Sequence, residues 1–351
     1  MSTTSIKLPS GAQIGHDLPC FLVAEIGNNH QGKLELAKEM VLAAAEAGIN
    51  GVKFQKRNID ALLNEDGKNA PYTGPNSFGP TYGKHRQALE LDVEQMAELR
   101  TLTHKLGMTF FASAWDHVSV DQMQDIGWDI AKICSADLVN IPMLRQIGAM
   151  GVPVILSTGM SSWEQIDRAV AELRAFHDNV VLLHCNSSYP CPEEEIGLPV
   201  MEAMRTRYGL PVGYSGHERG YAPTLAAVAR GACVIERHIT LNKNLPGTDH
   251  QVSLEPGQLR ELVTMIREVE RSMLVTDKQI FAKESQAAVK LRKSIVAARD
   301  LQVGQVLTAE DLAVKSPGDG MSPLLWDEVL GKKLTVFLAK DEQLRDDALG
   351  S

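Results

Sequence analysis

The sequence predicts an α/β protein composed of a (β/α)8 TIM barrel followed by a small C-terminal domain. Eight apolar, strand-like segments, each followed by a helical segment, recur over roughly 250 residues, which favours the barrel over an open doubly wound sheet. Polar or ionisable residues follow all eight apolar segments. Chemistry in such barrels lies at the carboxyl ends of the strands, so this placement supports the prediction.

Each element is predicted from its own local pattern. The helix at 33–47 places Leu36, Met40, Val41 and Ala44 on one face and ends at Gly48. We expect strands at 21–26, 50–55, 108–112, 128–134, 153–156, 180–184, 211–214 and 233–235. The further helices are expected at 92–106, 118–126, 140–150, 163–177, 194–208, 221–230 and 255–272.

The domain boundaries follow from where this alternation stops. Residues 1–274 are predicted to form the barrel, 275–290 a polar linker and 291–351 the small domain. The first 19 residues are expected to be a lead-in. A polar insertion at 56–91 interrupts the barrel, and a loop of this length is usually functional, often as a lid.

Composition excludes several classes of protein. The 351 residues contain no apolar run long enough to span a membrane and no basic-then-apolar start typical of a secretory signal. The net charge of −9 argues against nucleic-acid binding. Five scattered cysteines, an odd number, indicate a reducing, cytoplasmic compartment.

A pair of histidines in matched positions predicts a divalent metal site. His217 and His238 each follow an apolar strand segment, and an Ala-rich helical segment joins these two strands. Parallel strands joined in this way end at the same sheet edge, so we expect the ring nitrogens within about 8 Å of each other. Two imidazoles can hold a metal and leave positions open for substrate. Each histidine could instead cap its strand, but the neighbouring Glu236 favours the metal.

Two lysines and several serines predict an anion site at the same edge. Lysine with converging hydroxyl and backbone donors binds phosphate or carboxylate in water-poor surroundings. Any one serine could simply be a small residue near a strand end, but their recurrence favours an anion site. The residues concerned are Lys53, Lys132, Ser113, Ser135, Ser157 and Ser215.

Two carboxylates complete the predicted site. Glu25, after the first strand, suits general acid/base work or the positioning of water, although it could simply pair with Lys53. Asp249, in a loop after the last strand, is a weaker candidate for binding a polyol, because aspartates are common in loops.

With these residues assembled, the chain resembles the sialic acid synthase family, and residues 291–349 resemble its antifreeze-like SAF domain. The order and spacing of the matching segments make the resemblance far more specific than any single one. They are AEIGNNHQG (24–32), VKFQ (52–55), AKICSAD (131–137), ILSTGM (155–160), LLHCNSSYP (182–190), GYSGHERG (213–220) and ERHIT (236–240).

The resemblance implies a reaction and roles for the residues. The family condenses phosphoenolpyruvate with N-acetylmannosamine or its 6-phosphate, releasing phosphate by C–O cleavage. It implies Mn²⁺ or Mg²⁺ on His217 and His238, with Glu25 acting on the water that adds to C2. The implied phosphoenolpyruvate site is Lys53, Ser113, Lys132, Ser135, Ser157, Ser187 and Ser215. The implied sugar or metal-shell residues are Gln55, Tyr189, Glu236 and Asp249.

The resemblance also implies a homodimer in which the small domain of one chain covers the barrel mouth of the other. An arginine that many bacterial members carry in this domain is replaced by Ser316, so its sugar contact is missing or has moved to Lys315. Lys84, His85 and Arg86, in the insertion, could contact a sugar phosphate or form a solvated loop.

Other functions stay open at this point. A synthase for legionaminic, pseudaminic or deaminated nonulosonic acids would use the same chemistry on another sugar. A Schiff-base keto-acid aldolase would need a lysine with a depressed pKa and no metal, and the histidine pair argues against it. A non-enzymatic carbohydrate- or ice-binding protein would not need this constellation at the strand ends.

Overall fold

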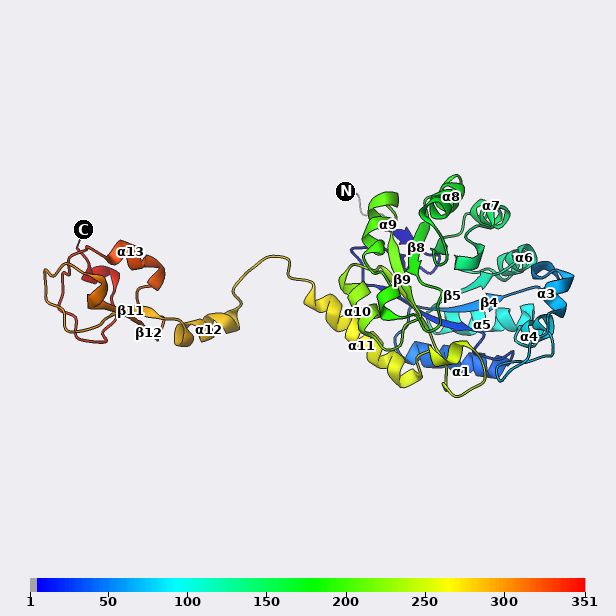
Figure 1. Cartoon of the computed structure of the whole chain (residues 1–351), viewed down its shortest axis with the longest axis horizontal. Helices are drawn as coiled ribbons and strands as arrows, with labels where there is room; N and C mark the ends of the chain where they lie inside the picture. Colours follow the sequence, from blue (N-terminus) through cyan, green and yellow to red (C-terminus); the bar gives the residue numbers. More distant parts are fainter. Residues whose placement is uncertain (1–4, 351) are drawn as a thin grey trace. The chain divides into compact units, whose positions relative to one another are not determined.

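The structure is a computed structural model that describes residues 5–350. It contains two compact units, the first ending at Leu274 and the second beginning at Val275. The first unit is a closed barrel of parallel strands surrounded by helices (Figure 1). The predicted (β/α)8 fold is therefore confirmed.

The barrel strands follow one another in chain order, and β10 pairs with β3 to close the ring. The strands are β3 (Phe21–Gly27), β4 (Gly51–Lys56), β5 (Thr109–Ala114), β6 (Ile130–Ile133), β7 (Val154–Ser157), β8 (Val180–Cys185), β9 (Val212–Gly216) and β10 (Val234–His238). The helices that follow them are α1 (Leu34–Glu46), α5 (Val93–Lys105), α6 (His117–Ile126), α7 (Ile141–Ala149), α8 (Trp163–Arg174), α9 (Val200–Tyr208), α10 (Ala222–Ala229) and α11 (Pro256–Ser272).

Apolar side chains fill both the barrel interior and the layer between strands and helices. Phe111 and Leu183 belong to the interior cluster, and both are fully buried. Ile6 and Ile14 join this cluster from the small antiparallel sheet of β1 (Ile6–Lys7) and β2 (Gln13–Ile14). The expected lead-in is therefore a hairpin that adds apolar residues to the barrel core, which its short sequence did not indicate.

The insertion after β4 is more ordered than the long loop that the sequence predicts. It contains the short helices α2 (Ile59–Leu62), α3 (Glu65–Asn69) and α4 (Tyr82–Ala88). Asn58, Asn64 and Thr81 cap these helices, each accepting a hydrogen bond from a backbone N–H of the first turn. The caps allow such short helices to form without an amphipathic pattern.

The second unit has its own apolar core. It comprises α12 (Ala282–Leu291), the antiparallel pair β11 (Ser294–Ala297) and β12 (Leu312–Lys315), and short helical turns. Helix α12 occupies much of the expected linker, and Leu334 and Leu338 form isolated β-bridges outside the named strands. Lys315 forms an ion pair with Asp341 within this unit.

Two further observations concern membrane spans and cysteines, both of which the sequence analysis considered. No helix within residues 5–350 is long and apolar enough to cross a membrane. All five cysteines are free thiols, and four of them are buried.

Candidate active site

The carboxyl ends of the barrel strands enclose one polar pocket of about 230 Å³. Every predicted site residue except Asp249 lines it. Those residues are Glu25, Lys53, Gln55, Ser113, Lys132, Ser135, Ser157, Ser187, Tyr189, Ser215, His217, Glu236 and His238. The barrel therefore brings together side chains that lie more than 200 positions apart in the sequence.

The two histidines lie side by side at the ends of β9 and β10, with their ring centroids 5.4 Å apart. Nδ1 of His217 lies 2.6 Å from the backbone oxygen of Asn186. A carbonyl only accepts, so this nitrogen carries the proton and Nε2 keeps its lone pair. Burial lowers the pKa of His217 to about 4, and burial likewise lowers the pKa of His238. Both rings are therefore neutral at pH 7, which is the form that binds metals.

A buried ion pair holds the ends of these two strands together. Arg237 and Glu218 are 1% and 0% exposed, and Nη1 of Arg237 lies 3.1 Å from Oε1 of Glu218. Glu218 also accepts hydrogen bonds from the hydroxyls of Tyr214 at 2.8 Å and Thr224 at 2.6 Å. Since each charged residue is adjacent to one histidine, we expect the pair to help position the two imidazoles. In the sequence, Glu218 follows His217 and Arg237 precedes His238. This ion pair was not predicted, although the opposite charges beside the two histidines could have indicated it.

The residues present fit a divalent metal with an incomplete set of protein ligands. Nδ1 of His238 and Oε2 of Glu236 are buried without a hydrogen-bond partner. Within residues 5–350, no three His, Cys, Asp or Glu side chains group closely enough to hold an ion by themselves. A metal held by the two imidazoles would therefore need water or substrate to complete its coordination, as open catalytic sites do.

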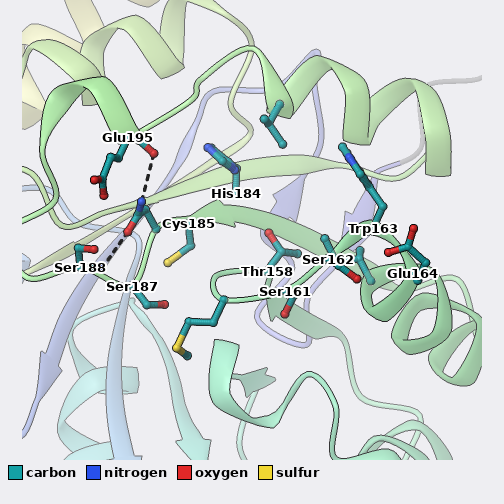
Figure 2. Close-up of a pocket in the computed structure, with 14 residues that line it drawn as sticks. Thr158, Ser161, Ser162, Trp163, Glu164, His184, Cys185, Ser187, Ser188 and Glu195 are labelled. Atoms are coloured by element: carbon teal, nitrogen blue, oxygen red, sulfur yellow. Dashed lines mark hydrogen bonds between the residues drawn. The ribbon is translucent and has the colours of Figure 1, made fainter.

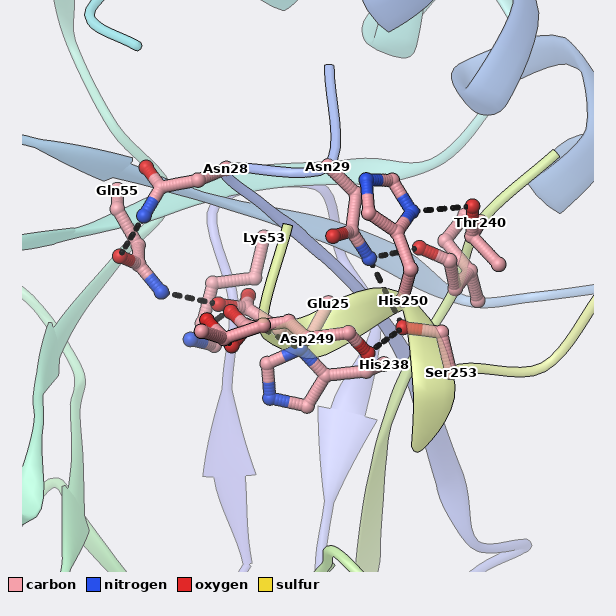
Figure 3. Close-up of polar contacts among 12 residues, drawn as sticks. Glu25, Asn28, Asn29, Lys53, Gln55, His238, Thr240, Asp249, His250 and Ser253 are labelled. Carbon is pink, nitrogen blue, oxygen red and sulfur yellow. Dashed lines mark hydrogen bonds and ion pairs between the residues drawn. The ribbon is translucent and has the colours of Figure 1, made fainter. Parts of the chain in front are cut away.

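Glu25 and Lys53 form a buried ion pair at the centre of the pocket. Nζ of Lys53 lies 2.7 Å from Oε2 of Glu25, and Gln55 donates to Oε1 at 2.9 Å (Figure 3). Burial raises the pKa of Glu25 to about 7, although Lys53 acts in the opposite direction. Burial alone would lower the pKa of Lys53, but the charges of Glu236 and Glu25 raise it. The lysine is therefore a fixed cation, while Glu25 can gain or lose a proton near neutral pH.

Glu236 lies between the two lysines. Its Oε1 is 3.7 Å from Nζ of Lys53 and 3.9 Å from Nζ of Lys132, and it accepts a hydrogen bond from Ser215 at 3.1 Å. Burial alone would raise the pKa of Glu236, but Lys132 and Lys53 hold it below its ordinary value. Because Glu25 also pairs with Lys53, the two ammonium groups leave positive charge available to an anionic ligand when Glu25 is protonated.

The serines lie at or just after the carboxyl ends of five consecutive strands, β5 to β9, and line the same pocket as the lysines. Ser157 accepts a hydrogen bond from Lys132 at 2.7 Å, and Ser113 accepts one from Lys53 at 3.4 Å. Gly159, which the sequence interpretation missed, lies against two others. A Cβ at this position would lie 2.4 Å from Oγ of Ser187 and 2.8 Å from Oγ of Ser135. Only glycine therefore leaves both hydroxyls where they are.

The expected sugar-binding residues do not form one group: Gln55 contacts Glu25 and Glu236 lies between the lysines, whereas Tyr189 and Asp249 lie near the histidines. The ring of Tyr189 is centred 4.0 Å from that of His217 and is 47% exposed. Asp249 lies outside the pocket, but its Oδ2 is 4.0 Å from Nδ1 of His238 (Figure 3). It lines a smaller neighbouring cavity together with residues of the insertion.

A larger groove of about 610 Å³ lies beside the site, along the loops after β7 and β8 (Figure 2). It shares Met160, Cys185 and Ser187 with the pocket. Its lining has no lysine or arginine, and it includes the acids Glu164 and Glu195. The predicted anion-binding groups are therefore in the smaller pocket.

Several other side chains at the site were not predicted. Trp115, Cys134 and Cys185 line the pocket next to the predicted serines and lysines. Arg57 is 3% exposed, and it donates to Gln55 and, at 3.0 Å, to Asn28. It thereby supports the amide that contacts Glu25. This role of Arg57 was not predicted, because the residue belongs to a polar insertion whose charged residues suggest a solvated loop.

The fold and the pocket define a (β/α)8-barrel enzyme whose strand ends place two buried lysines beside a histidine pair. A model of the NeuB family matches residues 40–278, and a SAF domain model matches residues 292–350. The chain therefore belongs to the NeuB family and carries a SAF domain, and the resemblance seen in the sequence is confirmed.

Relatives named for two different activities have the same sequence identity to this chain. N-acetylneuraminate-9-phosphate synthase of Homo sapiens is 37% identical over 97% of this chain and 96% of its own length. N,N'-diacetyllegionaminic acid synthase of Campylobacter jejuni is 37% identical over 93% of this chain and 98% of its own. The crystal structure of N-acetylneuraminic acid synthetase from Leptospira borgpetersenii has a TM-score of 0.71 and 32% identity, covering 81% of this chain and 95% of its own.

Proposed function

We propose that this protein is a sialic acid synthase that condenses phosphoenolpyruvate with N-acetylmannosamine or its 6-phosphate. The products are N-acetylneuraminate, or its 9-phosphate, and inorganic phosphate. The observation that carries the proposal is the convergence of Lys53, Lys132, His217 and His238 in one pocket. The names of the relatives support the same reaction.

The two lysines and the serine hydroxyls bind the phosphate and carboxylate of phosphoenolpyruvate. Ion pairs with Glu25 and Glu236 hold Lys53 in a fixed position, so its ammonium group is directed before substrate arrives. Ser157 orients Lys132 in the same way. The buried pocket strengthens these charge interactions, since water does not screen them.

The methylene carbon of phosphoenolpyruvate then forms a bond to the aldehyde carbon of the open-chain sugar. His217 and His238 would hold Mn²⁺ or Mg²⁺, which would supply Lewis-acid polarisation of the aldehyde. Glu25, with a pKa of about 7, takes a proton from the water that adds to the cationic C2. The resulting tetrahedral intermediate loses phosphate by cleavage of its C2–O bond.

Isotope labelling tests both whether the reaction occurs and whether the C2–O bond is the one that is cleaved. The protein is incubated with Mn²⁺, N-acetylmannosamine or its 6-phosphate, and phosphoenolpyruvate carrying ¹⁸O at the C2–O bridge. Mass spectrometry should find a nonulosonic acid and the label in the released phosphate. Label retained in the organic product, or no phosphate release with any mannosamine, would contradict the proposal.

The metal assignment has its own test. His217→Ala or His238→Ala should abolish Mn²⁺ binding, measured by electron paramagnetic resonance, while the circular dichroism spectrum keeps its wild-type form. Activity should also disappear with a chelator and return with Mn²⁺. Turnover that is unchanged in either variant would remove the assignment.

A second candidate is the same condensation on the sugar precursor of legionaminic acid. It is favoured by the relative from Campylobacter jejuni, which is as similar as the human one. Competition between the two amino sugars in one assay separates these candidates, because the preferred acceptor has the higher kcat/KM.

We also propose a homodimer in which the SAF domain of one chain covers the barrel mouth of its partner. Removing residues after Val289 should then weaken sugar use, whereas a fully active truncated barrel would contradict the arrangement. The five free thiols support a reducing, cytoplasmic compartment.

A further inference from the structure

Arg57 lies behind the active-site pocket, immediately after strand β4, and does not line the pocket itself. Its Nη2 donates to Oε1 of Gln55, and its Nη1 donates to Oδ1 of Asn28 at 3.0 Å. Gln55 in turn donates from Nε2 to Oε1 of Glu25 at 2.9 Å (Figure 3). A buried cation is therefore connected to the Glu25 carboxylate through a single side-chain amide.

The guanidinium of Arg57 determines which way round the Gln55 amide lies. The oxygen and nitrogen of a side-chain amide are nearly the same size, so the group can turn over and exchange their positions. Because a guanidinium has only donors, the amide oxygen must face Arg57. The NH2 group then points at Glu25 and donates to it. A reversed amide would place its oxygen against the carboxylate and lose this hydrogen bond.

Asn28 acts in the same direction as Arg57. With its oxygen held by the guanidinium, Asn28 donates from Nδ2 to Oε1 of Gln55 at 3.2 Å. This oxygen therefore accepts two hydrogen bonds, which is its full capacity, and one N–H of Gln55 is used by Glu25. Only one N–H of the Gln55 amide is left for a substrate.

Contacts on its other side hold Arg57 in place. Its Nη1 lies 3.1 Å from Oε1 of Glu90, and its backbone N–H donates to Oε2 of the same carboxylate at 2.9 Å. Its guanidinium carbon lies 4.5 Å from the centre of the Trp115 ring, which is a cation–π distance. The guanidinium is thus fixed from several directions before it contacts the two amides.

Gly27 leaves room for the hydrogen bond between Gln55 and Glu25. Its φ of +54° lies in the left-handed region, and the pairing of β3 with β4 shifts register between Glu25 and Gly27. A Cβ at Gly27 would lie 3.0 Å from Oε1 of Glu25 and 3.3 Å from Nε2 of Gln55. The backbone is therefore also adapted to this contact.

We propose that Arg57 is a positioning residue for the condensation: by fixing the direction of the Gln55 amide, it holds the Glu25 carboxylate in the orientation from which this group acts on water. The inference rests on the proposed function, in which Glu25 takes a proton from the water that adds to C2. Lys53 holds the other carboxylate oxygen, Oε2, at 2.7 Å. The carboxylate is thus held from two sides, and loss of Arg57 releases one of them. Because Arg57 does not line the pocket, its loss should lower kcat rather than raise KM.

A double-mutant cycle on kcat tests whether Arg57 acts through the amide. Arg57→Met should lower kcat roughly 10- to 100-fold, the range for loss of a hydrogen bond to a charged group. The KM for phosphoenolpyruvate should stay within about threefold of the wild-type value. Gln55→Leu should lower kcat to a similar extent, and adding Arg57→Met to it should cost less than about a further twofold. Arg57→Lys should recover part of the loss, since an ammonium group also has only donors.

The matched control is Arg267→Met, at the opposite end of the barrel. Arg267 pairs with Glu270 at 2.9 Å and donates to the backbone oxygen of Cys20, just before β3 begins. This variant should lower the melting temperature and leave kcat unchanged. If Arg57→Met does not fold, Arg57→Gln gives the same comparison, because its amide can still donate to Glu90 but can itself turn over.

Losses in kcat that add in the double variant, or a wild-type kcat in Arg57→Met, would overturn the inference. A raised KM for phosphoenolpyruvate with unchanged kcat would also overturn it, since Arg57 would then act on binding. A wild-type protein that releases no phosphate contradicts the proposed function instead. A crystal structure of Arg57→Met needs no turnover: the contact between Gln55 and Glu25 should be lost or lengthened, and an unchanged contact refutes the inference.

Discussion

Replacing Arg237 by Met should destabilise the barrel by about 3 kcal/mol, because it leaves the Glu218 carboxylate buried without its cation. Breaking a buried ion pair from one side costs roughly 3–5 kcal/mol. The lower part of this range applies here, since Tyr214 and Thr224 still donate hydrogen bonds to the carboxylate. At roughly 2–4 °C per kcal/mol for a domain of about this size, the melting temperature should fall by about 6–12 °C.

Differential scanning calorimetry of the full chain measures this effect. Arg168→Met is the matched control, because that arginine is 63% exposed and pairs with Glu172 at the surface. It should lower the melting temperature by no more than about 2–4 °C, since exposed ion pairs contribute up to about 1 kcal/mol. The double variant Glu218→Gln with Arg237→Met should recover part of the lost melting temperature, because it removes the unpaired buried carboxylate.

The same variant also tests the role of the ion pair at the active site. Arg237→Met should weaken Mn²⁺ binding, because Arg237 and Glu218 are adjacent to the two histidines. A melting temperature within about 2 °C of the wild type would refute the energetic reasoning. Unchanged Mn²⁺ affinity in a destabilised variant would show that the pair supports the fold without placing the imidazoles.

Three further predictions follow from the pocket. Lys132→Ala should raise the KM for phosphoenolpyruvate roughly 100-fold and the KM for the sugar far less, because it removes a buried cation from the anion site. Equal effects on the two KM values in steady-state kinetics would contradict this. Since burial raises the pKa of Glu25 to about 7 and the carboxylate is the form that accepts a proton, kcat/KM should rise with pH through about 7. A pH–rate profile that is flat between about pH 5.5 and 8.5 would exclude that role. Gly159→Ala should raise the KM for phosphoenolpyruvate roughly tenfold, because the added methyl group displaces two hydroxyls; wild-type kinetics would show that the loop adjusts freely.

Much of this site could be predicted because, in a parallel barrel, the position of a residue along its strand determines where it lies in the barrel. Once eight strands are recognised, the residue at each carboxyl end must face the same mouth. Lys53 and Lys132 could therefore be grouped with His217 and His238 from the sequence alone. Asp249 was harder to place, because it belongs to a loop, and loops have no such register.

The residues that were missed act through contacts between elements. Gly159 is needed only because Ser135 and Ser187 approach it from other strands. Arg57 looks like a surface charge in the sequence, but the insertion buries it against Glu90. Neither local pattern nor composition carries this information.

The sequence by itself determined the number and order of the barrel elements and the residue types at the strand ends, since both arise from local periodicity and from the direction of the chain. Only the tertiary structure decided that the N-terminal hairpin joins the barrel core and that Arg237 and Glu218 pair out of contact with water. Burial and pairing depend on distances between segments remote in sequence, which no local pattern specifies.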